Sequence, residues 1–194
     1  GNREERIQGL RIFCEYRDQR SFPLLLPLLD QPCPVERMSA VYALGRNPCP
    51  SAVQKLVSLL ETDDNAYVRR ATAWSLANYD NQIVLKPLIN ALKNDVAAVR
   101  LWSSSSLAEI GNVSSKNAEL AAEQLLISLK IDNESGVRSN CIWSLCRLFE
   151  KLDNTFQECF VDECTKIALF DKEPSVMEEA KTALDSMGMQ GFYN

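Results

Sequence analysis

The sequence is 194 residues long, and its 46% hydrophobic and 24% charged residues are typical of one ordinary folded domain. A formal net charge of −5 excludes nucleic acid as the main partner, because nucleic-acid binding needs clustered lysine and arginine. The chain has no histidine, the residue most used as a general base and zinc ligand. We expect one domain over residues 1–194, with no catalytic residue and no metal.

One segment recurs along the chain and predicts a series of similar helices. Each copy ends in an apolar anchor residue, and the spacings between successive anchors are 31, 32, 31, 38 and 39 residues. An arginine stands seven residues before every anchor except the last, where Met177 replaces it. The anchors are Phe13, Leu44, Leu76, Leu107, Leu145 and Leu184, and the arginines are Arg6, Arg37, Arg69, Arg100 and Arg138.

Between these copies, apolar residues three and four apart predict a second set of amphipathic helices. They lie in Phe22–Leu29, Val53–Leu60, Leu85–Leu92, Leu125–Leu129 and Cys164–Phe170. An aspartate follows each one, as expected of an acidic cap or turn: Asp30, Asp63, Asp95, Asp132 and Asp171. We place the extra residues of the two longest spacings in loops at 112–116 and 151–155.

A unit of helix, tight turn and helix that buries one face against its neighbours predicts a solenoid. The expected fold is an all-α, right-handed α-solenoid of about five to six two-helix repeats. The first anchored helix has no partner helix before it, so we expect further helices upstream of residue 1. No apolar stretch approaches the roughly 20 residues that span a bilayer, so we expect no membrane insertion.

The repeated segments resemble the HEAT-like repeats of the phycobilisome (phycobilin) lyase family. The match is carried by Leu44-Gly45, by Ala73–Leu76 and by Pro87–Leu92. The resemblance covers nearly the whole chain and is closest over 35–111. It implies the HEAT-like solenoid fold.

The recurring arginines and aspartates have two interpretations. They could bind a ligand, but their fixed place at the turn of every unit favours a ladder of ion pairs that ties adjacent units together.

The aromatic residues of the anchored helices point to a binding surface. Tyr42, Trp74 and Trp143 stand two places before their anchors, some 200° around the helix, and should face away from the core. The resemblance implies that this face is concave. Trp102 flanks it, and Arg46, Arg70 and Arg147 interleave with the rings. Such a column has the composition of a binding hot spot, although the rings could instead pack on the next repeat.

Two functions remain open for this face. One is a non-catalytic protein-interaction scaffold or adaptor that binds a partner protein and needs no cofactor. The other, implied by the resemblance, is a subunit of a phycobilin lyase or chaperone that delivers an open-chain tetrapyrrole to a phycobiliprotein cysteine. The rings would then stack on the pigment while the arginines meet its propionates. Its partner would be a phycobiliprotein or a second HEAT-repeat subunit.

Seven cysteines without a CxxC pair favour reduced thiols in the cytoplasm. We expect no disulfide and mostly buried cysteines, with one exposed thiol at Cys33 or Cys49 as the exception.

Overall fold

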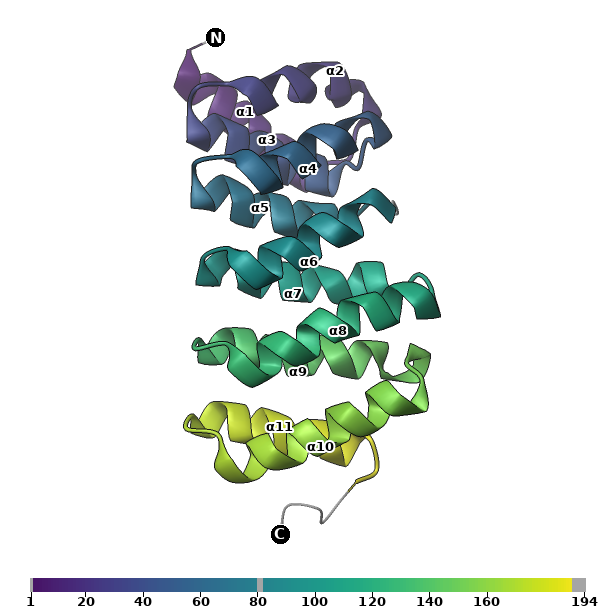
Figure 1. Ribbon diagram of the computed structural model, residues 1–194. Helices are drawn as coiled ribbons and strands as arrows, with labels where there is room; N and C mark the ends of the chain where they lie inside the picture. Colours follow the sequence, from purple (N-terminus) through teal and green to yellow (C-terminus); the bar gives the residue numbers. More distant parts are fainter. Residues whose placement is uncertain (1, 80–81, 190–194) are drawn as a thin grey trace.

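In the computed structural model, which describes residues 2–79 and 82–189, helices alternate between two layers that stack along one axis (Figure 1). The first helices of the units are α2 (Phe22–Leu25), α4 (Val53–Thr62), α6 (Leu85–Asn94), α8 (Ser115–Ile131) and α10 (Asn154–Phe170). The second helices are α3 (Pro34–Arg46), α5 (Ala66–Leu76), α7 (Ala97–Gly111), α9 (Ser135–Leu148) and α11 (Pro174–Ser186), preceded by α1 (Arg3–Glu15). The predicted all-α solenoid is confirmed.

The first helix layer departs from prediction where proline interrupts it. The helix expected over Phe22–Leu29 is a short α2 between the 3-10 turns η1 (Gln19–Ser21) and η2 (Leu26–Asp30). Pro27 has no N–H to donate, so a regular α-helix cannot run through it. Further 3-10 turns, η3 (Pro50–Ala52), η4 (Gln82–Val84) and η5 (Phe149–Lys151), precede α4, α6 and α10.

The extra residues of the two long spacings were wrongly placed in loops. They lengthen the first helices instead, because α8 and α10 have 17 residues each against ten in α4 and α6. In α8 the buried positions continue at helical spacing from Ala118 to Leu129, so the apolar face supports the additional turns. None of the described helices combines the length and the apolarity that a bilayer span requires.

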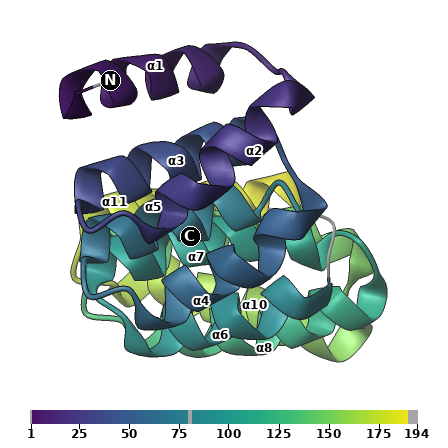
Figure 2. The ribbon, with the colours of Figure 1, turned by 90° about the horizontal axis from the view of Figure 1, so that it is seen from above.

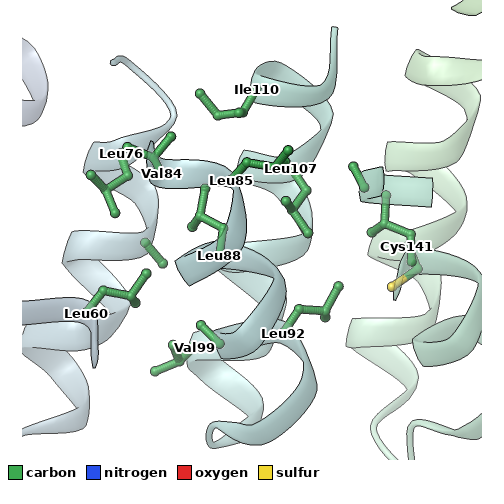
Figure 3. Close-up of a cluster of buried hydrophobic side chains, with 14 of the residues drawn as sticks. Leu60, Leu76, Val84, Leu85, Leu88, Leu92, Val99, Leu107, Ile110 and Cys141 are labelled. Atoms are coloured by element: carbon green, nitrogen blue, oxygen red, sulfur yellow. The ribbon is translucent and has the colours of Figure 1, made fainter. Parts of the chain in front are cut away.

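The hydrophobic core runs without a break between the two layers. Figure 3 shows Leu85, Leu88 and Leu92 from one first helix meeting residues of the second helices on either side. The anchors Leu44, Leu76, Leu107, Leu145 and Leu184 are fully buried. The sixth anchor, Phe13 on α1, is only partly buried. Burying one leucine side chain contributes roughly 2 kcal/mol, so no unit would be stable without its neighbours.

Small polar residues let the second helices approach one another closely. The Ser106 hydroxyl donates to the carbonyl of Ala73 at 2.8 Å, and the Ser144 hydroxyl donates to the carbonyl of Ser104 at 2.9 Å. Second helices contact their neighbours in the stack more extensively than first helices do. The second-helix layer is therefore the inner, concave side of the stack. Figure 2 shows α1 outside this layer, on the side opposite α4 and α6.

The predicted ladder of ion pairs is confirmed for four arginines. Each one binds both carboxylate oxygens of the aspartate in the next unit, through Nε and Nη2, at 2.7 to 3.0 Å. Each Nη1 also donates to a backbone carbonyl in the turn before its own helix. The rungs are Arg37–Asp63, Arg69–Asp95, Arg100–Asp132 and Arg138–Asp171.

The ladder aspartates end the first helices and shape the turns rather than capping the second helices. Asp63, Asp132 and Asp171 each accept the backbone N–H two residues later at 2.9 to 3.0 Å. At the start of the chain the pattern changes, because Arg6 pairs with the buried Glu36 and Asp30 pairs with Lys55. The outward position of α1 accounts for this different partner.

Acid is expected to weaken the ladder. Burial disfavours the charged forms of Asp63, Asp132 and Asp171, but hydrogen bonds from the arginines and turn N–H groups outweigh it and lower the pKa of each. An unfolded aspartate has a pKa of about 3.9, so this stabilisation is present above that pH and lost below it. The melting temperature followed by circular dichroism should fall as pH drops below about 4. The melting temperature of Asp63→Asn should fall less steeply with pH than that of the unchanged protein. An equally steep fall would contradict the stabilising role of the charged Asp63.

Candidate functional site

The second helices carry a line of accessible side chains on the face that points away from the first helices, which we call the concave strip. It comprises the positions six before, two before and two after each anchor, which share one helix face. All its members in the four central units are at least partly exposed. They are Met38, Tyr42 and Arg46; Arg70, Trp74 and Asn78; Leu101, Ser105 and Glu109; and Ser139, Trp143 and Arg147.

The four predicted aromatic residues divide into two kinds. Trp143 is 40% exposed and Trp102 is 37% exposed, which is high for such large apolar side chains. Tyr42 and Trp74 are half-buried, with ring centroids 5.4 Å apart. All four side chains are at least partly exposed, and Trp102 and Trp143 are more exposed than Tyr42 and Trp74.

Trp74 rests against the preceding unit at a glycine. A Cβ atom on Gly45 would lie 2.5 Å from the Trp74 ring and 3.2 Å from the Cα of Ser75, so only glycine allows this approach. The Arg46 guanidinium covers Trp74, 5.4 Å from the ring centroid. Gly45, Tyr42 and Arg46 on α3 therefore hold the ring in one orientation.

Arg70 lies over another aromatic residue in the same unit. Its guanidinium is 5.5 Å from the centroid of Tyr67, and Nη2 is 3.5 Å from the Tyr42 hydroxyl. The Nε atom is buried and has no hydrogen-bond partner in the described part of the chain. Arg70 thus keeps much of its hydrogen-bonding capacity unused.

The far end of the strip repeats the pairing of arginine and tryptophan. Arg147 lies 5.1 Å from the centroid of Trp143 and also forms an ion pair with Glu109 at 2.8 Å. Both partners of this pair are more than 40% exposed. Arg147 is therefore neutralised at the surface.

A hollow of about 480 Å³ opens at the N-terminal end of the strip. Helix α1 forms one wall with Ile7 and Arg11, and α3 and α5 form the other with Met38, Tyr42, Arg46 and Trp74. A second hollow of about 160 Å³ shares Val35 and Met38 with it and reaches Tyr67 and Arg70. Three of the predicted residues, Tyr42, Trp74 and Arg46, thus meet in one place, whereas Trp143 stands apart on the open strip and Trp102 lies beside the strip.

Sequence reasoning missed Ile7 and Arg11 as parts of this site. The signal was available, because Ile7 stands six places and Arg11 two places before Phe13, which are the positions that define the strip elsewhere. A further hollow, of about 370 Å³, lies at the Arg69–Asp95 rung, where the ion pair already occupies the polar groups.

The sequence matches a model of HEAT repeats over residues 1–77 and 53–146. The chain belongs to the HEAT-repeat family. No curated protein matches the sequence significantly.

Solved structures resemble this HEAT-repeat protein over nearly its whole length. The complex of CpcE and CpcF of phycocyanin lyase from a Nostoc species has a TM-score of 0.68 at 21% identity, covering 86% of this chain and 99% of that one. A designed armadillo repeat protein in complex with the peptide (KR)4 has a TM-score of 0.66 at 18% identity, covering 97% and 91%. Human deoxyhypusine hydroxylase has a TM-score of 0.53 at 17% identity, covering 97% and 78%. At these identities the likeness establishes the fold alone.

The thiols of this HEAT-repeat protein differ in exposure. The expectation of mostly buried cysteines was wrong, because only Cys49, Cys141 and Cys164 are buried. Of the two thiols proposed as the exposed one, Cys49 is buried beside Tyr79 and Cys33 is half-exposed, while Cys159 is exposed. Burial raises the pKa of Cys141 and Cys164, and it raises the pKa of Cys146 to about 11. Backbone hydrogen bonding at the start of α3 lowers the pKa of the Cys33 thiol. Among the described residues, no three Cys, Asp or Glu side chains are grouped to hold a metal ion.

Proposed function

We propose that this HEAT-repeat protein is a non-catalytic scaffold that binds a segment of a partner protein along the concave strip. The observation that carries the proposal is the exposure of Trp102 and Trp143 on the same face that holds Tyr42 and Trp74. Leaving two indole rings in water is unfavourable unless a partner covers them. A cytoplasmic location is part of this proposal, and the seven cysteines without a CxxC pair support it.

The chemistry of the strip matches the centre of a protein interface. Tryptophan, tyrosine and arginine are the residues most enriched among binding hot spots. Here three arginine–aromatic contacts hold the long side chains in place, at Trp74, Tyr67 and Trp143. Side chains that are ordered before binding lose less entropy when the partner arrives.

Site-specific photo-crosslinking tests the scaffold function. A photoreactive benzoylphenylalanine in place of Trp102 or Trp143 should crosslink a defined partner protein in lysate of the native organism. The control carries the same group in place of Ile127, which is 43% exposed on the first helix α8. Once that partner is identified, Trp143→Ala should weaken its binding about thirtyfold. Equal crosslinking from all three positions, or unchanged affinity of Trp143→Ala, would contradict the scaffold function.

A phycobilin lyase subunit is the second candidate function. One observation favours it: the hollow of about 480 Å³ brings Tyr42 and Trp74 together with Arg11 and Arg46, and its size suits a small ligand. In that function the rings would stack on an open-chain tetrapyrrole, the arginines would bind its propionates, and the acceptor would be a phycobiliprotein. After incubation with phycocyanobilin and gel filtration, visible absorption would travel with the protein. A colourless protein peak would contradict this second function.

A further inference from the structure

The arginines of this chain fall into two electrostatic classes. Those of the ladder are each neutralised by an aspartate of the next unit. Arg11, Arg46 and Arg70 have no carboxylate within ion-pair distance among residues 2–79 and 82–189, and the Arg70 guanidinium lies against Tyr67 and Tyr42. The N-terminal half of the strip therefore carries positive charge that the described chain does not neutralise.

The unneutralised arginines face a cavity that is otherwise mainly apolar. Arg11 lies on the α1 wall and Arg46 on the α3 wall, and no aspartate or glutamate lines the hollow between them. Glu15, one turn further along α1, is not among the lining residues. Because Arg46 contacts Trp74 through the ring face, its N–H groups stay available to an incoming acceptor.

We propose that the hollow binds an acidic segment of a partner polypeptide, placing a bulky apolar side chain against Met38 and Trp74 with flanking carboxylates on Arg11 and Arg46. This inference rests on the scaffold function and specifies the chemistry of the partner. Arginine pairs with carboxylates through two parallel hydrogen bonds, which gives geometric specificity as well as attraction. A basic segment is disfavoured, because like charges would meet at both walls.

The dimensions of the strip favour a polypeptide as the occupant. Packed helices lie 8 to 10 Å apart, so the distance along the strip from α3 to α9 is roughly 30 Å. An extended chain of about nine residues covers that distance. A segment anchored at Trp74 would thus reach Trp102 and Trp143, where exposed rings continue the same face.

Binding of three matched peptides, each about 12 residues long and labelled with a fluorophore, tests the proposal by anisotropy. The first peptide carries leucine and phenylalanine anchors between glutamates. The second replaces the glutamates with lysines, and the third keeps the glutamates but replaces the anchors with alanine. The first peptide should bind at least tenfold more tightly than the other two, and added salt should weaken its binding.

Charge-matched variants assign the binding to the hollow. Arg11→Gln combined with Arg46→Gln should weaken binding of the first peptide about tenfold, whereas Arg17→Gln with Arg20→Gln should leave it within about twofold. The control removes the same charge from exposed positions outside the hollow. Arg11→Lys with Arg46→Lys should keep part of the affinity, because the charge remains while the bidentate geometry is lost. Circular dichroism and melting temperature verify that each variant is folded.

The outcomes separate this inference from the scaffold function. Equal binding of the acidic and basic peptides, an unaffected Arg11→Gln/Arg46→Gln variant, or no binding of the first peptide up to about 1 mM would overturn the acidic segment. If photo-crosslinking at position 102 or 143 still captured one defined partner, the scaffold would stand with a partner of different chemistry. If crosslinking captured none and the peptide bound as expected, the acidic site would stand and the partner along the strip would be refuted.

Discussion

Arg138→Met is expected to lower the free energy of unfolding by about 3 to 5 kcal/mol, because it leaves a buried carboxylate without its ion-pair partner. The Arg138 side chain is 5% exposed and that of Asp171 is 9% exposed, making this the most buried rung of the ladder. Methionine keeps most of the volume of the arginine stem but neither binds Asp171 nor donates to the carbonyl of Asp132. Urea unfolding followed by circular dichroism measures the difference.

Two further variants separate the loss of the ion pair from a general effect of losing an arginine. Adding Asp171→Asn to Arg138→Met should recover part of the stability, because the buried charge disappears while the side-chain oxygen can still accept from the N–H of Glu173. Arg147→Met breaks a pair with more than 40% exposure on both sides, so it should cost at most about 1 kcal/mol. Equal losses for Arg138→Met and Arg147→Met would refute the buried rung as a source of stability.

Gly45→Ala is expected to destabilise the protein by about 2 kcal/mol and to move Trp74. The new methyl group would lie 2.5 Å from the ring and 3.2 Å from the Cα of Ser75. The tryptophan must therefore rotate outward or α3 and α5 must separate, and such overpacking typically costs about 1 to 3 kcal/mol. The shift should appear as a change in tryptophan emission together with a lower melting temperature.

Gly9→Ala is the matched control for this substitution. Gly9 also lies inside a helix, but a Cβ atom there would meet nothing within 4 Å. The exchange should raise stability by about 0.5 to 1 kcal/mol, because alanine loses less backbone entropy in a helix. If Gly9→Ala raises the stability and Gly45→Ala lowers it, then helix packing, and not helix propensity, requires Gly45. A stabilising Gly45→Ala would mean that the Trp74 ring is not held as described.

Features that repeat along the chain could be predicted from the sequence. The anchor spacing located the second helices, and the recurring arginine and aspartate predicted the ladder before any geometry was known. The same spacing predicted that Trp143 faces away from the core and that Trp102 flanks that face, because direction around a helix follows from residue number alone. The spacing of the repeats gives no contact distances, however, so only the structure shows how Trp74 packs on Gly45.

Features that occur only once in the chain could not be predicted from the repeat pattern. Helix α1 packs on α3 but is displaced outward from the second-helix layer; this position creates the hollow, brings Arg11 opposite Arg46 and pairs Arg6 with Glu36 instead of Asp30. These contacts depend on how α1 packs, and the other repeats contain no information about that packing. The additional turns of α8 were misjudged for a related reason, since a longer unit was compared with shorter ones.

The ladder also makes the length of this solenoid easy to change. Every rung joins an arginine of one unit to an aspartate of the next, so each internal unit offers the same donor on one side and the same acceptor on the other. If the segment from Asp64 to Asp95 were duplicated in the gene, Arg37 would still meet Asp63, and each copy of Arg69 would find an aspartate 26 residues later. Gain or loss of whole units by recombination therefore preserves the junctions, while the concave strip grows or shortens to suit a partner of different length.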